Sequence, residues 1–464
     1  MVRSTGNTYN VSKEQNASGI GRRRFRPYPE YKDSGVEWLD QIPSHWNVKR
    51  LKFIASINDE VLAETTDPQY EMTYVDIGGV DQYQGIVDRE KYVFETAPSR
   101  ARRKVREGDV IISTVRTYLR AIAQIEAPES NLIVSTGFAV IRTSPIFSSR
   151  YAAYALRASY FIEKIVANSV GVSYPAIDAS KMSSFSASFP ELMEQEAIAA
   201  FLDHETAKID ALIEKKERLI ELLQEKRTAL ITQAVTKGLD PTVPMKDSGV
   251  EWLGKIPAHW NVKRIKTVAC LNTGGTPAGL LDEAFELEGV PWVKPDHLNG
   301  DHGIIMPDRR LSLSAAKAVG IIEAGSSLVC GIGTVGKTGH APFIVCTNQQ
   351  INAITFGCKV TNRFGQFIVS CLSQEFMRRA NKVTLAICNK SEMGEVFICT
   401  PPLTEQRAVA AFLDRETAKI GTLLAKTHEA IDRLKEYRAA LISAAVTGKI
   451  DVRDVGSKKR SDEN

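Results

Sequence analysis

The chain resembles itself in two separate segments, and this repeat restricts its fold more than any other feature. Residues 32–55 and 246–269 are identical at 18 of 24 positions and share the sequence KDSGVEWL. Residues 194–236 recur at 405–447, where EQEAIAAFLD becomes EQRAVAAFLD. The chain is therefore a tandem duplication, in which an opening block, a variable region and a helical block occur twice in the same order.

The variable regions, residues 56–188 and 270–399, have diverged almost completely. Both contain short apolar runs, such as DVIISTV and GFAVIRT in the first and SSLVCGIGTVG and INAITF in the second. Runs of this kind between turn residues are typical of strands, and each region closes on a helical stretch. We expect an α+β domain in each half. Whatever the two halves do differently must be done in these regions.

The helical blocks carry apolar residues every three or four positions, which is the spacing of one stripe on a helix. The stripe residues are Ile209, Leu212, Ile213, Ile220, Leu223 and Leu230 in the first block and Ile420, Leu423, Leu424, Ile431, Leu434 and Leu441 in the second. Each block is predicted to be an amphipathic helix of roughly 25–40 residues, which needs a partner in water. We expect the two copies to pack together as an antiparallel coiled coil with pseudo-twofold symmetry. Two unrelated surface helices are the alternative.

Four of the five tryptophans lie in the opening blocks: Trp38, Trp46, Trp252 and Trp260. Such a group is either a platform on which nucleic-acid bases stack or part of a hydrophobic core. We expect a core, because the tryptophans keep fixed positions in a duplicated segment.

Composition excludes several classes of protein. A length of 464 residues suggests about three domains. The net charge of +4 permits nucleic-acid binding without demonstrating it. All seven cysteines lie in the second half and none forms a C-x-x-C pair, so we expect neither a disulfide framework nor a zinc site. No apolar run approaches the length of a membrane span, and we expect a cytoplasmic protein that does not contact membranes.

Residues 331–338, GIGTVGKT, match the phosphate-binding loop of nucleotide hydrolases. That loop needs a helix directly after its Lys-Thr pair, to bind phosphate with backbone amides. Here Gly339 and Pro342 follow, and then the strand-like FIVC. We therefore predict a hairpin turn. A nucleotide-hydrolysing enzyme with this loop is the alternative function.

The segment YPEYKDSGVEWL from Tyr28, its second copy, and the pair FPELMEQEAIAAFLD and PPLTEQRAVAAFLD resemble the specificity subunits of type I restriction-modification systems. The resemblance covers nearly all of residues 28–452. It implies a non-catalytic subunit that reads a bipartite DNA site with two target-recognition domains, held apart by two spacer helices. The implied organisation is a basic N-terminal extension (1–31), the first recognition domain (32–189), the first spacer helix (190–245), the second recognition domain (246–400), the second spacer helix (401–452) and a polar C-terminal tail (453–464).

The same resemblance implies the partners of the chain. They are double-stranded DNA, two adenine-methyltransferase subunits docked on the spacer, and restriction subunits that act as motor and nuclease. S-adenosylmethionine, ATP and Mg²⁺ would be bound by those partner subunits, so we expect no cofactor and no metal on this chain. A coiled-coil adaptor without a DNA role is a further alternative, which the divergent, arginine-bearing regions disfavour.

Three segments are ordinary motifs of such recognition domains by this likeness: Gly108–Val110, Gly171–Ile177 and Gly333–Gly339. The second domain departs from the pattern, because Lys382 stands in place of Gly171. The N-terminal extension contains the basic run GRRRFR at 21–26. We expect a solvated, disordered tail there, with a phosphate-binding arm as the alternative.

Residues that read bases must lie in the variable regions, since shared blocks cannot distinguish two half-sites. Arg, Lys, Asn and Gln are the side chains that pair with base edges in two-hydrogen-bond geometry. The DNA-binding candidates are Arg102, Arg103, Lys104, Arg116, Tyr118, Arg120, Ser173 and Tyr174 in the first domain and Lys294, Arg309, Arg310, Lys337, Asn348, Gln349 and Gln350 in the second. For each of them, a solvated charge or a phosphate contact is the alternative.

Overall fold

The computed structural model describes residues 25–171, 175–277, 284–300, 303–381 and 385–453. Contacts divide the chain into a first unit, Met1–Ile213 with Ile431–Asn464, and a second unit, Glu214–Ala430. Each unit takes its opening block and variable region from one half of the duplication, and helical segments from both halves. The residue limits that the sequence suggests for the domains stay a prediction.

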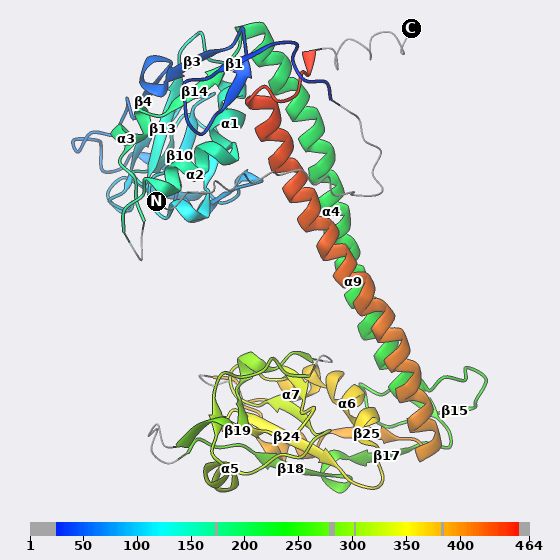
Figure 1. Ribbon diagram of the computed structural model, residues 1–464. Coiled ribbons are helices and arrows are strands. Elements are labelled where there is room, and N and C mark those ends of the chain that lie inside the picture. Colours follow the sequence, from blue (N-terminus) through cyan, green and yellow to red (C-terminus); the bar gives the residue numbers. More distant parts are fainter. Residues whose placement is uncertain (1–24, 172–174, 278–283, 301–302, 382–384, 454–464) are drawn as a thin grey trace, which may run out of the picture. The chain divides into compact units, whose positions relative to one another are not determined.

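The first unit contains two four-stranded sheets with the strand orders β11-β10-β13-β4 and β8-β5-β12-β9. Its elements are β1 (Tyr31–Asp33), β2 (Gln41–Pro43), β3 (Asn47–Arg50), β4 (Ala55–Ile57), β5 (Glu71–Val75), β6 (Val80–Asp81), β7 (Gly85–Ile86), β8 (Glu90–Val93), β9 (Ala101–Lys104), β10 (Val110–Ser113), β11 (Ile122–Gln124), β12 (Leu132–Ser135), β13 (Phe138–Thr143), α1 (Ser149–Arg157), α2 (Ser159–Ala167), α3 (Ala179–Ser183) and β14 (Ser186–Phe189). All four residues of β10 and of β12 are buried, because other elements cover both faces of these strands. Helix α1 lies against β10 and β13 (Figure 1).

The second unit repeats this plan. Its elements are β15 (Met245–Asp247), β16 (Lys255–Pro257), β17 (Asn261–Arg264), β18 (Ala269–Thr273), β19 (Phe285–Val293), β20 (Arg310–Leu311), α5 (Leu313–Val319), β21 (Ser327–Cys330), β22 (Thr338–His340), β23 (Cys346–Thr347), β24 (Ile351–Phe356), α6 (Asn362–Ser370), α7 (Ser373–Arg379), α8 (Lys390–Gly394) and β25 (Phe397–Thr400). The sheet β22-β21-β24-β18 corresponds to β11-β10-β13-β4 strand by strand. The parallel pair β19–β23 corresponds to β5–β12. An α+β domain in each half is thus confirmed, although the two sequences have diverged.

The helical blocks form α4 (Leu192–Lys237) and α9 (Leu403–Val446), of 46 and 44 residues. Both helices are longer than the predicted 25–40 residues, because they begin well before the first residue of the apolar stripe. No helix in the described ranges is long and apolar enough to span a membrane.

The apolar stripe is only partly buried. Of its members, Ile209, Ile213, Ile420, Ile431 and Leu441 are buried, and Ile220, Leu223, Leu230, Leu424 and Leu434 are half-buried. Leu212 and Leu423, which occupy the same position in the two copies, are 44% and 51% exposed and differ from the prediction. Successive helical residues are rotated by about 100° around the axis. Ile209 and Ile213 therefore lie at the centre of the stripe, and Leu212 lies at its edge.

The opening blocks pack into the core, as predicted for their tryptophans. Trp46 and Trp260 are fully buried, whereas Trp38 and Trp252 are half-buried. The indole Nε1 of Trp46 donates to Glu194 at 3.1 Å, and that of Trp260 donates to Glu405 at 2.9 Å. These glutamates lie in the first turns of α4 and α9.

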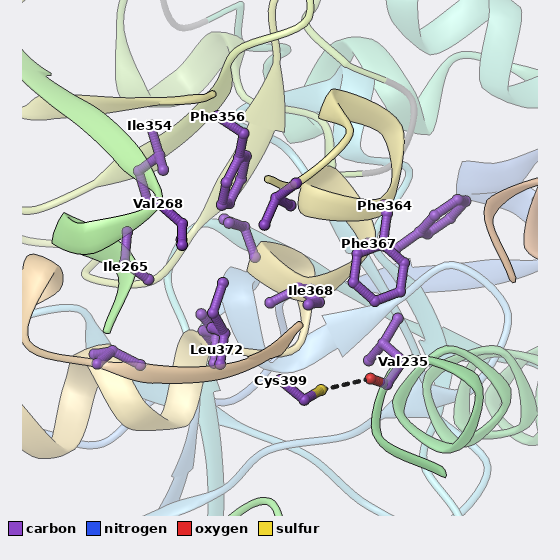
Figure 2. Close-up of a cluster of buried hydrophobic side chains, with 14 of the residues drawn as sticks. Val235, Ile265, Val268, Ile354, Phe356, Phe364, Phe367, Ile368, Leu372 and Cys399 are labelled. Atoms are coloured by element: carbon purple, nitrogen blue, oxygen red, sulfur yellow. Dashed lines mark hydrogen bonds between the residues drawn. The ribbon is translucent and has the colours of Figure 1, made fainter. Parts of the chain in front are cut away.

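Each unit is completed by the C-terminal end of a long helix. In the first unit, the hydroxyl of Tyr151 donates to the Val446 carbonyl of α9 at 3.1 Å. In the second unit, the Cys399 thiol donates to the Val235 carbonyl of α4 at 2.8 Å, inside the cluster that also contains Phe364 and Phe367 (Figure 2). The helix that leaves one variable region therefore ends against the other variable region.

Residues 25–31 of the N-terminal extension are packed, and for these residues the expectation of a solvated tail is wrong. Phe25 meets Phe201 edge to face at 5.4 Å. Tyr28 is 2% exposed, and its hydroxyl donates to Glu194 at 2.7 Å. The Asp451 amide donates to the Arg26 carbonyl at 2.7 Å, beyond the end of α9. Phe25 thus packs on α4, whereas the ring of Tyr28 lies against His45 and Trp46 of the opening block. Residues 21–24 of the basic run lie outside the described residues.

Candidate DNA interface

The variable region of the first unit has a corner where the β10–β11 hairpin meets a second loop. The Arg116 amide donates to the Pro175 carbonyl and the Ile177 amide to the Thr114 carbonyl, each at 2.8 Å. These bonds join the hairpin turn to the segment that follows α2. The residues of this segment proposed for DNA binding, Ser173 and Tyr174, lie outside the described residues.

The second unit builds the same corner from different residues. The Gly333 amide donates to the Ala386 carbonyl at 3.0 Å, and the Cys388 amide to the Gly331 carbonyl at 2.8 Å. The corresponding bonds place Gly333 where the first unit has Arg116. Lys382, at the position of Gly171, lies outside the described residues.

The phosphate-loop sequence, residues 331–338, is the turn of the β21–β22 hairpin. The Cys330 amide donates to the Lys337 carbonyl at 2.8 Å, and the Gly336 amide to the Cys330 carbonyl at 2.9 Å. Strand β22 begins at Thr338 and pairs antiparallel with β21. Because a strand and not a helix follows the Lys-Thr pair, the loop lacks the helix N-terminus that phosphate binding needs. The predicted hairpin turn is confirmed.

Two arginines of the first corner have a left-handed backbone. Arg116 has φ 52° and ψ 47°, and Arg120 has φ 52° and ψ 35°, at the two ends of the 3₁₀ turn Thr117–Leu119. In the second corner, the matching hydrogen bonds place Gly333 and Gly336 there, with φ 83° and 85°. Glycine adopts this conformation freely, whereas a residue with a Cβ pays roughly 1–2 kcal/mol. The first corner therefore carries strain that the second one lacks.

The motif Gly108–Val110 positions the β10 strand. Asp109 is 1% exposed and accepts two hydrogen bonds from the Arg142 guanidinium, at 2.9 Å to Oδ1 and 2.7 Å to Oδ2. This pairing raises the pKa of Arg142 above its ordinary value. The motif is thus part of the scaffold of the corner.

The basic residues of β9 are not one cluster. A strand directs successive side chains to opposite faces, so Arg103 points away from Arg102 and Lys104. The Arg102 guanidinium lies 4.4 Å from the ring centre of Phe94, and Lys104 is exposed. The Nε of Arg103 is buried without a hydrogen bond, and burial lowers the pKa of this side chain. Strand β9 also belongs to a different sheet from the β10–β11 hairpin.

The candidates of the second unit gather at the end of β19. The Lys337 Nζ donates to the Asp296 carbonyl at 3.5 Å, and the Asn348 amide donates to the Val293 carbonyl at 3.1 Å. The Nζ of Lys294 lies 4.9 Å from the ring centre of Trp292. Lys337 therefore contacts the segment that follows Lys294, although the two lysines are 43 positions apart in the sequence.

The remaining candidates of the second unit have unequal access to a ligand. Asn348 is 7% exposed, and its side chain bonds Gln350 twice, donating at 2.8 Å and accepting at 3.2 Å. Asn348 therefore stabilises the loop of residues 348–350, whereas Gln349 in the same loop is exposed. Arg309 is exposed beside the Phe285 ring, at 5.1 Å, and Arg310 is half-buried on β20. Base reading by any of these residues stays a prediction.

Two functional features escaped the sequence-based prediction. Leu119 is 42% exposed beside Tyr118 at the tip of the first corner, and only its place between two arginines marked it. In the first unit the buried Arg438 of α9 bonds the partly exposed Asp210 of α4, with contacts of 2.9 and 3.2 Å. The sequence marks this ion pair only by a difference between the two helical blocks, since Asp210 of the first aligns with Gly421 of the second.

A family model described as the type I restriction modification DNA specificity domain matches residues 43–222 and 257–433. Two relatives from Methanocaldococcus jannaschii match nearly the whole chain. The putative type I restriction enzyme MjaX specificity subunit is 22% identical over 427 residues, which are 89% of this chain and 96% of the relative. The type I restriction enzyme MjaIX specificity subunit is 22% identical over 453 residues, which are 93% and 99% of the two chains.

One solved structure is similar in both fold and sequence. It comes from work on complex assembly and conformational transition of the type I restriction-modification system. The TM-score is 0.67 and the identity 25%, over 88% of this chain and 99% of the solved one.

Proposed function

Since the chain belongs to the family of type I restriction-modification DNA specificity proteins, we propose that it reads a bipartite DNA site, one half with each unit. In this role it is a non-catalytic subunit of a cytoplasmic complex. The first half-site is bound by the corner at Arg116, and the second by the corner at Gly333 and Lys337.

One observation carries this proposal: a single backbone scaffold presents two different sets of side chains. One four-stranded sheet corresponds strand by strand in the two units, and the same interloop hydrogen bonds form both corners. The exposed residues nonetheless differ, with Arg116, Tyr118 and Arg120 in the first corner and Lys337 in the second. A protein that reads two different sequences with two copies of one domain needs this combination, because the scaffold positions the domain and the side chains specify the bases.

The long helices are proposed to pair as an antiparallel coiled coil that spaces the two readers. Two contacts support this pairing. In the first unit Asp210 of α4 bonds Arg438 of α9. In the second unit Val235 of α4 shares a core cluster with Val409 and Leu413 of α9. A helix of 46 residues is about 69 Å long at 1.5 Å per residue, which suits a rigid spacer.

Catalysis is assigned to partner subunits. We propose that two methyltransferase subunits, which bind S-adenosylmethionine, dock on the spacer helices, and that restriction subunits, which bind ATP and Mg²⁺, join that assembly. The hairpin geometry of residues 331–338 disfavours the alternative of a nucleotide-hydrolysing enzyme.

Sequencing of methylated adenines tests this function. Cells that contain the methyltransferase subunit are compared with and without this chain. We expect methylation at one bipartite sequence, with two defined parts and a fixed gap, only when the chain is present. An unchanged methylation pattern, or methylation at a single undivided sequence, would overturn the proposal.

A further inference from the structure

The two corners differ in the length of their turns and in the residue types at the turn ends. The turn of residues 116–120, which we name the arginine turn, has one residue more than its counterpart, residues 333–336. Both of its ends are arginines in the left-handed conformation, and both ends of the counterpart are glycines. Glycine at both ends would relieve this strain. A strained backbone is expected to persist where the side chains, here those of the arginines, are needed for function.

The arginine turn holds an apolar tip outward. Thr117 is 3% exposed, and its hydroxyl lies 2.9 Å from that of Ser169 at the end of α2, which fixes the base of the turn. The next two side chains, Tyr118 and Leu119, are 55% and 42% exposed. In the second corner the apolar residue, Val335, is instead 6% exposed. The extra residue of the first turn thus accompanies an apolar pair turned toward solvent.

Arginines on both sides of an apolar tip match the surface of a DNA duplex at an opened base step. Apolar side chains that enter between base pairs from the minor groove unstack them, and flanking guanidinium groups bind the adjacent phosphates. The Arg120 side chain is exposed and makes no hydrogen bond or ion pair within the described ranges of the chain. It is therefore available to a phosphate.

We propose that the arginine turn is a wedge that unstacks one base step of the half-site read by the first unit. Tyr118 and Leu119 contact the opened step, and Arg116 and Arg120 bind the backbone on its two sides. The second unit has no such wedge, so the duplex is distorted in one half-site only. This inference rests on the proposed function.

The alternative ligand of the arginine turn is a protein partner, and the duplication of the chain disfavours it. Two copies of one partner subunit would meet equivalent surfaces on the two units. The arginine turn is a place where the units differ, in length, in charge and in exposure of the tip. DNA is the partner whose two halves differ.

The test uses the intact complex on its bipartite duplex, with 2-aminopurine placed singly at each adenine position of both half-sites other than the methylated adenines, because methyltransferases extrude their target base from the stack. Unstacking raises the fluorescence of this base. We expect a rise at one step of one half-site and none in the other. The double variant Tyr118→Ala, Leu119→Ala should abolish the rise. Ile146→Ala, a control that removes a 47%-exposed side chain elsewhere in the first unit, should keep it.

The arginines have a separate test that distinguishes function from structure. Arg116→Gly and Arg120→Gly both remove left-handed strain, and for Arg120→Gly, whose side chain makes no hydrogen bond or ion pair within the described ranges, the melting temperature should stay the same or rise. DNA affinity should fall about fivefold or more for each, and the slope of log affinity against log salt should decrease by about 1. A lower melting temperature with unchanged affinity would mean that the arginines stabilise the fold only, and would overturn the proposal.

The outcomes separate the two proposals. A wild-type complex that does not bind any bipartite site removes the proposed function itself. A complex that binds its site without a rise in fluorescence, or with a rise that survives in the double variant, removes the wedge alone. A double variant that loses the methyltransferase subunits and keeps the rise would assign the turn to a protein contact.

Discussion

Replacing Asp210 with asparagine should loosen the end of α9 in the first unit. Arg438 is 7% exposed, and its guanidinium bonds both carboxylate oxygens of Asp210. Burial, followed by the nearby charge of Arg438, lowers the pKa of Arg157. The Asp210 carboxylate pairs directly with Arg438 and, after Glu126, also favours the charged form of Arg157. Asparagine keeps the shape of the Asp210 side chain and removes its negative charge.

The size of the effect follows from the burial of the two partners. Breaking a fully buried ion pair costs about 3–5 kcal/mol, and an exposed one contributes about 0–1 kcal/mol. The Asp210 side chain is 44% exposed, so solvent screens part of the loss. We therefore expect about 2 kcal/mol, which is a factor of about 30 in the opening equilibrium.

Hydrogen exchange of the amides in residues 431–446 measures this opening directly. Exchange there should accelerate about 30-fold in Asp210→Asn. The matched control is Glu221→Gln on the same helix, which breaks an ion pair with Arg218 whose side chains are 61% and 60% exposed. That control should change the free energy of unfolding by less than about 0.5 kcal/mol. An acceleration below about threefold in Asp210→Asn would refute the role given to the pair.

Three further predictions concern the hairpin, the spacer and the thiols. Lys337→Ala should leave the DNA-saturated ATPase of the full complex within about twofold, because the phosphate-loop sequence lacks its helix; loss of turnover would restore the enzyme hypothesis. Four helix-forming residues inserted near Thr228 add about 6 Å and about one full turn, so methylation mapping should show a gap longer by one or two base pairs, whereas an unchanged gap would exclude the spacer role. At pH 8 a maleimide should label the exposed Cys270 and Cys358 and spare Cys399. Burial raises the pKa of Cys399 to about 12, which leaves almost no thiolate at that pH; equal labelling of all three would contradict the burial.

The repeat in the sequence predicted much of the fold. Two copies of an opening block implied two similar domains, and the tryptophans at fixed positions implied a core, which Trp46 and Trp260 confirm. Gly339 and the strand-like FIVC correctly predicted the hairpin at residues 331–338. The family was identified from the duplicated motifs, and the match of the family model confirms it.

Other features depend on contacts that a one-dimensional pattern does not contain. The apolar period placed Leu212 in the stripe, but its position relative to a partner surface decided its exposure. Three basic residues are adjacent in sequence on β9, but side chains alternate between the two faces of a strand. Arg103 therefore points away from Arg102 and Lys104. Lys337 and Asp296 are distant in sequence, and a hydrogen bond from the β21–β22 hairpin to the turn after β19 brings them together. The left-handed backbone of Arg116 was hidden, since arginine gives no local signal for it.

The central claim is that each unit reads one half of the DNA site, and an exchange of one variable region tests it most directly. Residues 56–188 are replaced by the corresponding region of a relative with a different site, and methylated adenines are then sequenced. We predict that one half-site changes to that of the relative while the other half-site and the gap stay as they are. A change in both half-sites, or in neither, would contradict the claim.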